Sequence, residues 1–197
     1  LEKAGLIYKL DRYIWESAAQ KLKEWKDKGA EQYHISVNIS TKDFYFVDIY
    51  EIFTGLIEKY DIRPDRLNLE ITETALMSDF DKNMEILKQL QEYGFKIEID
   101  DFGSGYSSLA SLNQMPFDTI KLDKSLVDYV GNENGEKLLK FIVQLVQSLG
   151  MKITAEGVEY KEQLDFLENL NCDDIQGFYF SKPLMLADFS AKLTENN

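Results

Sequence analysis

The sequence predicts an α/β fold in which a parallel sheet closes into a TIM-like barrel. Two observations indicate this class: six predicted strands alternate with predicted helices along the 197 residues, and each strand has one apolar and one polar face. Alternating strands and helices are typical of a parallel sheet, because a helix returns the chain to the start of the next strand. A doubly wound sheet is covered by helices on both faces and reads as nearly continuous Val, Ile and Leu. The polar face therefore favours the barrel.

Six strand-then-helix units are predicted from hydrophobic periodicity. Apolar residues at three- and four-residue spacing predict helices over residues 8–28, 47–60, 79–93, 136–149, 161–170 and 187–194. Shorter runs predict strands over residues 33–38, 67–71, 95–100, 119–122, 152–156 and 173–176. No Pro/Gly-rich linker or low-complexity segment divides the sequence, so we expect one continuous domain over residues 1–197.

Apolar and polar side chains alternate within each predicted strand. The apolar face carries Ile35, Val37, Leu67, Leu69, Ile97, Ile99, Ile120, Leu122, Ile153, Ala155 and Ile175. The polar face carries Ser36, Asn38, Asn68, Glu70, Glu98, Asp100, Thr119, Lys121, Thr154, Glu156, Asp174 and Gln176. Barrel interiors are usually filled with branched apolar side chains, so a polar interior indicates a functional site.

The last inward side chains of the six strands form a polar ring at one mouth of the predicted barrel. In strand order they are Asn38, Glu70, Asp100, Lys121, Glu156 and Gln176. Active sites of such barrels lie at the carboxyl ends of the strands, so we expect the site here. A TIM-type barrel has eight strands, whereas the sequence supplies six and Leu1 stands just before a helix. We therefore expect the first two strands to lie upstream of Leu1.

Composition disfavours several classes of function. The sequence has no run of 18 apolar residues and no signal-peptide pattern at its start, so we expect a cytoplasmic domain without direct membrane contact. The single cysteine, Cys172, cannot form an internal disulfide or a thiolate metal site. The net charge of −13 disfavours binding to long nucleic acid, which depends on clustered Lys and Arg. It allows a small nucleotide that is held through divalent cations.

The polar ring carries the donor atoms of a hard-cation site. Three or more carboxylates and an amide form an oxygen-only set that suits Mg or Mn rather than Zn. Asp100 and Asp101 run directly into Phe102-Gly-Ser-Gly105, where glycine permits a turn, and the two acids could bridge two cations. Two such cations stabilise in-line phosphoryl displacement. Lys121 would stabilise the nucleophilic water or the charge that develops on phosphorus.

Six motifs in the chain resemble the EAL domain family. They are Ser36-Val-Asn-Ile-Ser40, Glu70-Ile-Thr-Glu73, Asp100-Asp-Phe-Gly-Ser-Gly-Tyr-Ser-Ser-Leu109, Lys121-Leu-Asp123, Ala155-Glu-Gly-Val-Glu159 and Gln176-Gly-Phe-Tyr-Phe-Ser-Lys-Pro-Leu184. The six motifs occur in the family's order over essentially the whole chain. Several motifs in register are far less probable by chance than any one of them. The resemblance implies an incomplete EAL-type barrel and a phosphodiesterase that hydrolyses cyclic-di-GMP to linear pGpG. It also implies two Mg or Mn ions as cofactors.

The resemblance assigns metal ligands by position. It implies that Asn38, Glu70 and Asp100 hold the first metal. It likewise implies that Asp100, Asp101 and Glu156 hold the second, and that Asp101 and Glu156 also belong to the catalytic set.

Further roles are implied for residues outside the two ligand sets. Lys121 is similar to the family's lysine near the catalytic water, and Gln176 to its hydrogen-bonding glutamine across the site. Glu73 resembles the glutamate that fixes the glycine-containing loop. Asp123 is similar to the acid that neighbours the lysine in the same motif, and Glu159 to the second acid of its motif. A homodimer and a tether to GGDEF or sensory domains are implied by the resemblance alone.

Two features depart from the expected pattern. The glutamate of the namesake Glu-Ala-Leu motif belongs upstream of Leu1, and no Glu-Ala-Leu occurs in the chain. Loss of that ligand predicts little or no activity for the 197-residue chain alone. Glu98 points inward two residues before Asp100, and a buried anion needs a partner. We expect a lysine inside the barrel or a bound cation to neutralise it.

Simpler interpretations apply to single residues. Asp100-Asp101 alone would be a loop-capping pair, and Asp101-Phe-Gly103 matches a kinase metal motif although no His-Arg-Asp catalytic loop appears in the sequence. Lys121 could form a structural ion pair, and Glu159 could stabilise a helix N-terminus. Residues expected to be structural are His34, Trp15 and Trp25.

Three classes of function stay open on sequence alone. They are an enzyme, a degenerate EAL domain that binds cyclic-di-GMP as a receptor, and a domain kept for protein contacts or dimerisation. The polar ring, the lysine and the glycine-rich loop together favour the enzyme, because a protein-contact domain has no physical need for them. The residue that occupies the glutamate position of an upstream Glu-Ala-Leu motif would separate an enzyme from a receptor.

Overall fold

The computed structural model describes residues 7–103, 117–185, 188–189 and 192, and its centre is a six-stranded parallel sheet. The strands are β1 (Ile35–Ile39), β2 (Leu67–Thr72), β3 (Ile97–Phe102), β4 (Thr119–Leu122), β5 (Lys152–Ala155) and β6 (Asp174–Ile175). Their spatial order is β1-β2-β3-β4-β5-β6, and every neighbouring pair is parallel. Consecutive order fits a barrel-type sheet, because a doubly wound sheet reverses its order at a switch point. The predicted α/β class is confirmed.

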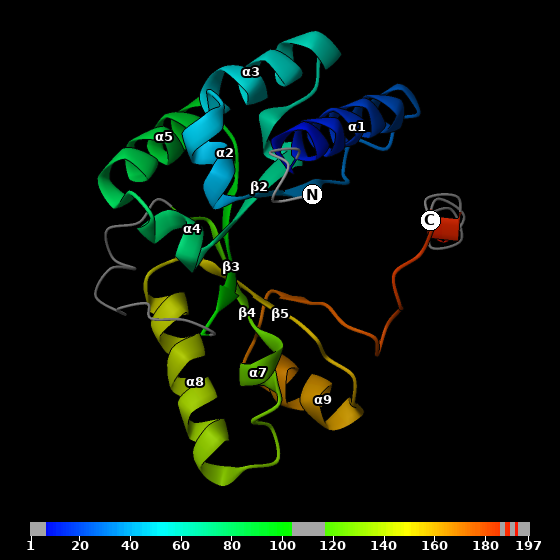
Figure 1. The fold of residues 1–197 in the computed structure, drawn as a ribbon. Helices are drawn as coiled ribbons and strands as arrows, with labels where there is room; N and C mark the ends of the chain where they lie inside the picture. The colour runs from blue at the N-terminus through cyan, green and yellow to red at the C-terminus, as the bar shows by residue number, and fades with distance from the viewer. Residues whose placement is uncertain (1–6, 104–116, 186–187, 190–191, 193–197) are drawn as a thin grey trace.

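The described part of the chain has five helices of nine or more residues, one before β1 and four between strands. They are α1 (Ile7–Asp27), α3 (Ile49–Tyr60), α5 (Phe80–Tyr93), α8 (Glu133–Ser148) and α9 (Lys161–Asn169). Each confirms a predicted helix to within a few residues. Figure 1 shows α1, α3 and α5 around the upper part of the strands and α8 and α9 around the lower part. Of the predicted helix over 187–194 the structure describes residues 188, 189 and 192, which are helical, and the other positions lie outside the described residues.

Three short helices, which periodicity did not predict, begin just after strands. They are α2 (Thr41–Phe46), α4 (Glu73–Met77) and α7 (Lys124–Val127). Helices of four to six residues are too short to display a 3.6-residue pattern. Side-chain caps mark two of their starts: Thr72 Oγ1 accepts from the Ala75 amide at 3.3 Å, and Asp123 Oδ1 accepts from the Ser125 amide at 2.9 Å. A 3-10 turn, η2 (Pro64–Arg66), leads into β2.

Caps also explain why two predicted helix starts were displaced. Helix α3 begins at residue 49 rather than 47, because Asp48 Oδ1 accepts from the Glu51 amide at 2.9 Å. Helix α8 begins at residue 133 rather than 136, because Asn132 Oδ1 accepts from the Gly135 amide at 2.9 Å. Strand β3 starts two residues later than predicted, and Phe95 before it is buried as part of the core.

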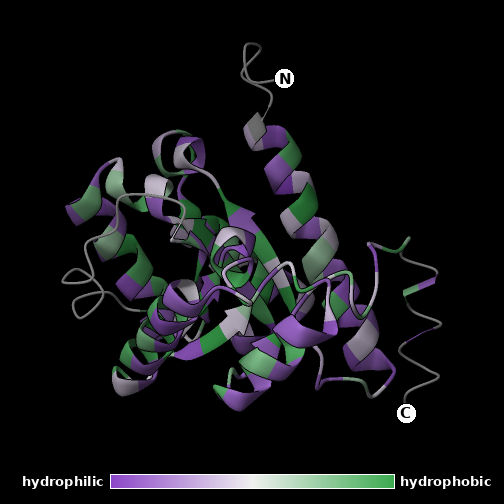
Figure 2. Ribbon diagram, turned by 90° about the horizontal axis from the view of Figure 1, so that it is seen from below, coloured by the Kyte–Doolittle hydropathy of each residue, from purple (hydrophilic) through white to green (hydrophobic). Residues whose placement is uncertain are grey.

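The hydrophobic core lies between the sheet and the helices around it. The predicted apolar face is buried almost completely, with Leu67, Leu69, Ile97, Ile120 and Ile153 at 0% exposure. Helix side chains complete this layer, and Figure 2 shows hydrophobic residues gathered toward the strands. Among the described residues, none of the helices combines the length and the apolar character that crossing a membrane requires.

The predicted polar face is also largely withdrawn from solvent. Asn68, Glu98, Thr119 and Lys121 are buried, although all four carry polar or charged groups. Buried polar groups must be hydrogen-bonded or paired to be tolerated. The apolar and polar alternation therefore gave the correct strand register, and the partners of these side chains define the site.

Candidate metal centre

Lys121 is the centre of a buried ionic cluster that joins four strands. Its Nζ atom lies 2.6 Å from Glu70 Oε1, 2.9 Å from Asp100 Oδ1 and 2.8 Å from Glu156 Oε1. Glu70 lies on β2, Asp100 on β3 and Lys121 on β4, and Glu156 directly follows β5. We call these four residues the Lys121 cluster. The structure thus brings together four members of the predicted polar ring.

The Lys121 cluster contains more negative than positive charge. Burial works against the ammonium charge, but the three carboxylate partners outweigh it and raise the pKa of Lys121. Burial raises the pKa of Glu70 and of Glu156, although Lys121 acts in the opposite direction on both. One ammonium group therefore compensates three partly buried carboxylates only incompletely. Additional positive charge at this place would relieve the imbalance.

A β-bulge places two consecutive aspartates at the same site. Ile99 pairs with Ile120 and Phe102 pairs with Leu122, so two residues of β3 stand opposite one residue of β4. In a regular strand consecutive side chains point to opposite faces, and a bulge removes that restriction. Asp101 adopts a left-handed backbone with φ 54°, which Asp tolerates better than most residues. Alternation alone did not predict this irregularity.

Three carboxylates around the bulge have the spacing of a cation site. One oxygen from each of Asp100, Asp101 and Glu156 lies within 4.8 Å of the others. Burial, Asp100 and Asp123 all raise the pKa of Asp101. Oxygen-only donor sets of this type fit Mg or Mn, so the residues present fit the cations that the resemblance implies.

Asn38 joins the same site from β1. Its Nδ2 atom donates to Glu70 Oε2 at 3.3 Å, and the two residues are paired in the sheet register. Its backbone carbonyl accepts a hydrogen bond from Trp15 Nε1 at 2.9 Å. The sequence predicted Trp15 as a core residue, which its 1% exposure agrees with, but gave no sign of this contact.

Glu98 lies inward as the alternation predicted, at 8% exposure. It accepts hydrogen bonds from Ser36 Oγ at 3.0 Å and Asn68 Nδ2 at 2.8 Å. Burial raises the pKa of Glu98, while Ser36, Asn68 and the more distant charge of Lys121 oppose that effect. Neutral donors make its hydrogen bonds among the described residues, and the expected lysine acts on Glu98 only as the more distant charge of Lys121, while the bound cation stays a prediction. The inward position supports the assigned register.

Glu73 and Gln176 are less closely tied to the Lys121 cluster. Glu73 is the first residue of α4 and is buried, and neither of its carboxylate oxygens has a hydrogen-bond partner among the described residues. The loop that the resemblance assigns to it, 102–107, lies outside the described residues beyond Gly103. Gln176 follows β6 with an exposed side chain, and within the described ranges that side chain makes no hydrogen bond to the cluster.

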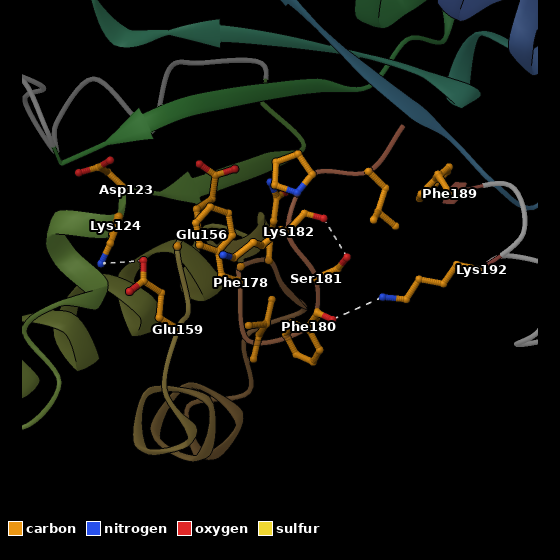
Figure 3. A pocket seen from close by; sticks show the side chains of 16 residues that line it. Asp123, Lys124, Glu156, Glu159, Phe178, Phe180, Ser181, Lys182, Phe189 and Lys192 are labelled. Carbon is orange, nitrogen blue, oxygen red and sulfur yellow. Dashed lines mark hydrogen bonds and ion pairs between the residues drawn. The ribbon is translucent and has the colours of Figure 1, made fainter. Parts of the chain in front are cut away.

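A cavity of about 850 Å³ opens beside the cluster. Its walls include Asp123, Glu156, Glu159 and Gln176, together with aromatic residues from the segment after β6 (Figure 3). Figure 3 also shows the ion pair between Lys124 and Glu159, at 3.7 Å. Glu156 is the member of the Lys121 cluster that reaches this cavity. Asp123 and Glu159 thus lie at the cavity rather than in the cluster.

Comparison with known proteins gives consistent matches. The family model described as "EAL domain" matches residues 1–183. The bifunctional diguanylate cyclase/cyclic di-GMP phosphodiesterase MucR of Pseudomonas aeruginosa is 34% identical over 184 residues, which is 93% of this chain and 27% of MucR. The chain spans about a quarter of the length of the curated relatives it matches.

Solved structures show the same similarity in three dimensions. The PaMucR phosphodiesterase in complex with c-di-GMP superposes with a TM-score of 0.89 at 33% identity, over 95% of this chain and 76% of that one. The manganese/cy-diGMP complex of Klebsiella pneumoniae BlrP1 gives a TM-score of 0.76 at 30% identity, over 87% of this chain and 44% of that one. Both similarities extend over most of the described sheet and helices.

Proposed function

The chain belongs to the EAL domain family, and on this premise we propose that the complete domain is a cyclic-di-GMP phosphodiesterase that releases linear pGpG, whereas the 197-residue chain alone has little or no activity. The observation that carries the proposal is the convergence of Glu70, Asp100, Lys121 and Glu156 from successive strand ends. A protein-contact module has no need for one buried lysine among three acids. Relatives named as cyclic di-GMP phosphodiesterases support the substrate.

We assign the two cations to overlapping ligand sets. Asn38, Glu70 and Asp100 would hold one, and Asp100, Asp101 and Glu156 would hold the other. The manganese complex of BlrP1 supports this choice of metal for a similar domain, and the all-oxygen donor set allows Mg as well. When bound, the two cations would polarise the phosphodiester and make the attacking water more acidic.

Lys121 acts on the reacting atoms in this proposal. Cations that bind the carboxylates would compete with its ion pairs, which frees ammonium hydrogens to donate to the attacking water or to a phosphoryl oxygen. The water oxygen bonds to phosphorus and gives up a proton, one P–O ester bond breaks, and the departing sugar oxygen takes up a proton, so that the linear product contains one added water. Gln176 and the cavity residues Asp123 and Glu159 would contact the nucleotide side of the substrate. Glu73 would position the loop beyond Gly103.

Turnover and binding must be measured together. Cyclic-di-GMP is incubated with Mn and either the 197-residue chain or the longer parent protein, and pGpG is separated by chromatography. The Asp100→Asn variant should lose at least about a hundredfold in rate, because Asp100 is the carboxylate that both proposed ligand sets share. Asp81→Asn, at an exposed helix position, is the matched control.

The outcomes separate the two candidate functions. Metal-dependent pGpG release that D100N abolishes and D81N retains supports the enzyme. Undetectable turnover by both parent and D100N, with nucleotide binding retained in calorimetry, selects a cyclic-di-GMP receptor. Loss of both turnover and nucleotide binding in the parent would reject both functions.

A further inference from the structure

Trp15 is the one described residue of α1 whose side chain donates a hydrogen bond to the backbone of a predicted metal ligand. Its Nε1 atom donates to the Asn38 carbonyl at 2.9 Å, across 23 positions of sequence. The ring is buried and packs against Phe53 of α3, with ring centroids 4.8 Å apart. Packing fixes the ring, so the N–H group has little freedom to follow a carbonyl that moves.

Asn38 has few other restraints in the described structure. It is exposed and lies one residue before the end of β1, which pairs with β2 alone among the described strands. Its side chain reaches Glu70 Oε2 at 3.3 Å, the long end of a hydrogen bond. Glu70 in turn pairs with Lys121 at 2.6 Å. A rigid support on the Asn38 backbone would therefore affect how its amide meets the site.

A purely apolar role does not account for this indole. The surrounding core would accept Phe or Leu in the same layer, whereas a buried indole N–H must find an acceptor. Here the acceptor is a carbonyl of the candidate centre rather than a carbonyl of the helix itself. The N–H group thus adds a directional contact to the packing.

We propose that Trp15 is a positioning residue of the metal centre. Its indole N–H holds the Asn38 backbone so that the side-chain amide stays beside Glu70 in the geometry that receives a divalent cation. The inference rests on the proposed function in one respect, namely that Asn38 is a metal ligand. The restraint on Asn38 itself does not depend on metal.

Trp25 provides a matched control on the same helix. It is also buried, and it packs against Tyr33 and Phe189 with ring centroids 5.6 and 6.3 Å away. Its indole nitrogen makes no hydrogen bond to the candidate centre within the described ranges. The sequence has two tryptophans, so an ¹⁵N-¹H correlation spectrum contains two indole signals, which W15F and W25F assign.

The first measurement uses the metal-free protein. W15F should shift or broaden the side-chain amide signals of Asn38, whereas W25F should leave them in place. The second measurement is a Mg titration and Mn affinity by electron paramagnetic resonance. Mg should shift the Trp15 indole signal and not that of Trp25, and W15F should weaken Mn binding about tenfold, as loss of groups that orient metal ligands does. Thermal unfolding reports the structural cost of each variant separately.

Two results would overturn the proposal. The first is that W15F leaves the side-chain amide signals of Asn38 unchanged. The second is that the wild type binds Mn and W15F binds Mn as tightly as W25F does.

If the wild type binds neither Mg nor Mn, the proposed function fails, and the Asn38 signals of the metal-free protein still decide the positioning role. If W15F does not fold, 3-benzothienylalanine at position 15 in the W25F background keeps the ring shape and removes only the N–H group. It should reproduce the loss of affinity, and wild-type affinity would contradict the proposal.

Discussion

The Lys121 cluster shows how single residues determine the chemistry of this site. Three carboxylates share one ammonium group, and the side chains of all four residues are at most 18% exposed. Buried charges are tolerated only when they are paired, and removal of one partner leaves the others uncompensated. Lys121 therefore has a structural role without metal, in addition to the catalytic role that we propose.

Replacement of Lys121 by Met should destabilise the metal-free protein. Met keeps the length of the side chain and removes the charge, so Glu70, Asp100 and Glu156 repel one another. The free energy of unfolding in urea with EDTA should fall by about 3 kcal/mol, the usual cost of breaking a buried ion pair. The half-buried Lys124, paired at 2.7 Å with Asp128 at the C-terminal end of the same short helix, is the control, and K124M should change stability by less than about 1 kcal/mol. Equal effects of the two variants would contradict a structural role for Lys121.

A second pair of acids, Asp11 and Asp43, lies where α1 meets α2. Asp43 is fully buried, and its Oδ2 atom accepts from Ser40 N and Oγ, whereas Oδ1 has no partner among the described residues. Burial raises the pKa of Asp11, and the Asp43 carboxylate beside it adds to the effect. Folding therefore makes the Asp11 carboxyl hold its proton more tightly than in the unfolded chain.

Asp11→Asn should stabilise the protein at neutral pH. The folded state binds the Asp11 proton more tightly than the unfolded state, so the wild type loses stability as pH rises from the ordinary aspartate pKa, about 4, through the raised one. The variant cannot titrate there, and its amide can donate to Asp43. Its advantage in the free energy of unfolding should grow with pH to about 1 kcal/mol at pH 7. Urea titrations at several pH values measure the difference in the free energy of unfolding between variant and wild type. Glu168→Gln, at an exposed helix position, is the control. A stabilisation by Asp11→Asn that shrinks with rising pH would contradict a raised pKa of Asp11.

The residues of the site were largely predictable, and their supports were not. Strand alternation brought Glu70, Asp100 and Lys121 together because the period of a strand is two and the register was correct. The contact between Trp15 and Asn38 depends on how α1 packs over β1, which local periodicity does not encode. The hydrogen-bond donors to Glu98 come from β1 and β2, and strand alternation did not identify them.

At the level of elements, the segments after β5 and β6 form one interlocked unit. The Val158 amide donates to the Gln176 carbonyl at 3.1 Å, and the Tyr179 amide donates to the Val158 carbonyl at 2.9 Å. Gly177 lies between these contacts, where a Cβ atom would stand 2.1 Å from Val158 O. This close approach of two backbones requires glycine at the position.

Gly177→Ala should therefore be severely destabilising. The clash involves backbone atoms, which cannot move without breaking the two hydrogen bonds, so we expect a loss of about 3 kcal/mol or more in the free energy of unfolding. Gly55, exposed within α3 with open space around its Cβ position, is the opposite control. G55A should stabilise the protein by up to about 1 kcal/mol. Chemical denaturation of both variants tests the pair, and a mild effect of G177A would show that the segments can separate.

Prediction of the elements succeeded where packing and periodicity agree. Helices such as α5 and strands such as β4 appeared close to their predicted bounds because one face of each is continuously apolar. The short helices α2, α4 and α7 were missed because capping residues define them rather than an apolar stripe. The bulge at Asp101 was missed because a bulge interrupts the alternation from which the strand was predicted.

For the whole molecule, the net charge of −13 opposes compaction, and three partly buried acids gather around Lys121 at the candidate metal centre. Divalent cations would reduce the repulsion within this group of acids and also the repulsion between acids over the whole surface. They neutralise the site specifically, and they also screen the general repulsion between acidic surfaces. The two effects can be separated, because screening depends on ionic strength whereas binding depends on particular ligands.

Addition of Mn should raise the melting temperature through the site. A ligand that binds only the folded state adds about 2.7 kcal/mol of stability at a hundred times its Kd, and for a domain of about 200 residues this corresponds to a shift of about 5–10 °C. NaCl at equal ionic strength should give a clearly smaller shift. Asp101→Asn keeps a residue type that tolerates the left-handed backbone but removes a ligand charge, so its Mn-specific shift should fall by at least half. Differential scanning calorimetry with Mn, NaCl or EDTA measures these melting temperatures. If Mn raised the melting temperature of D101N and of the wild type equally, the cation would bind away from the bulge.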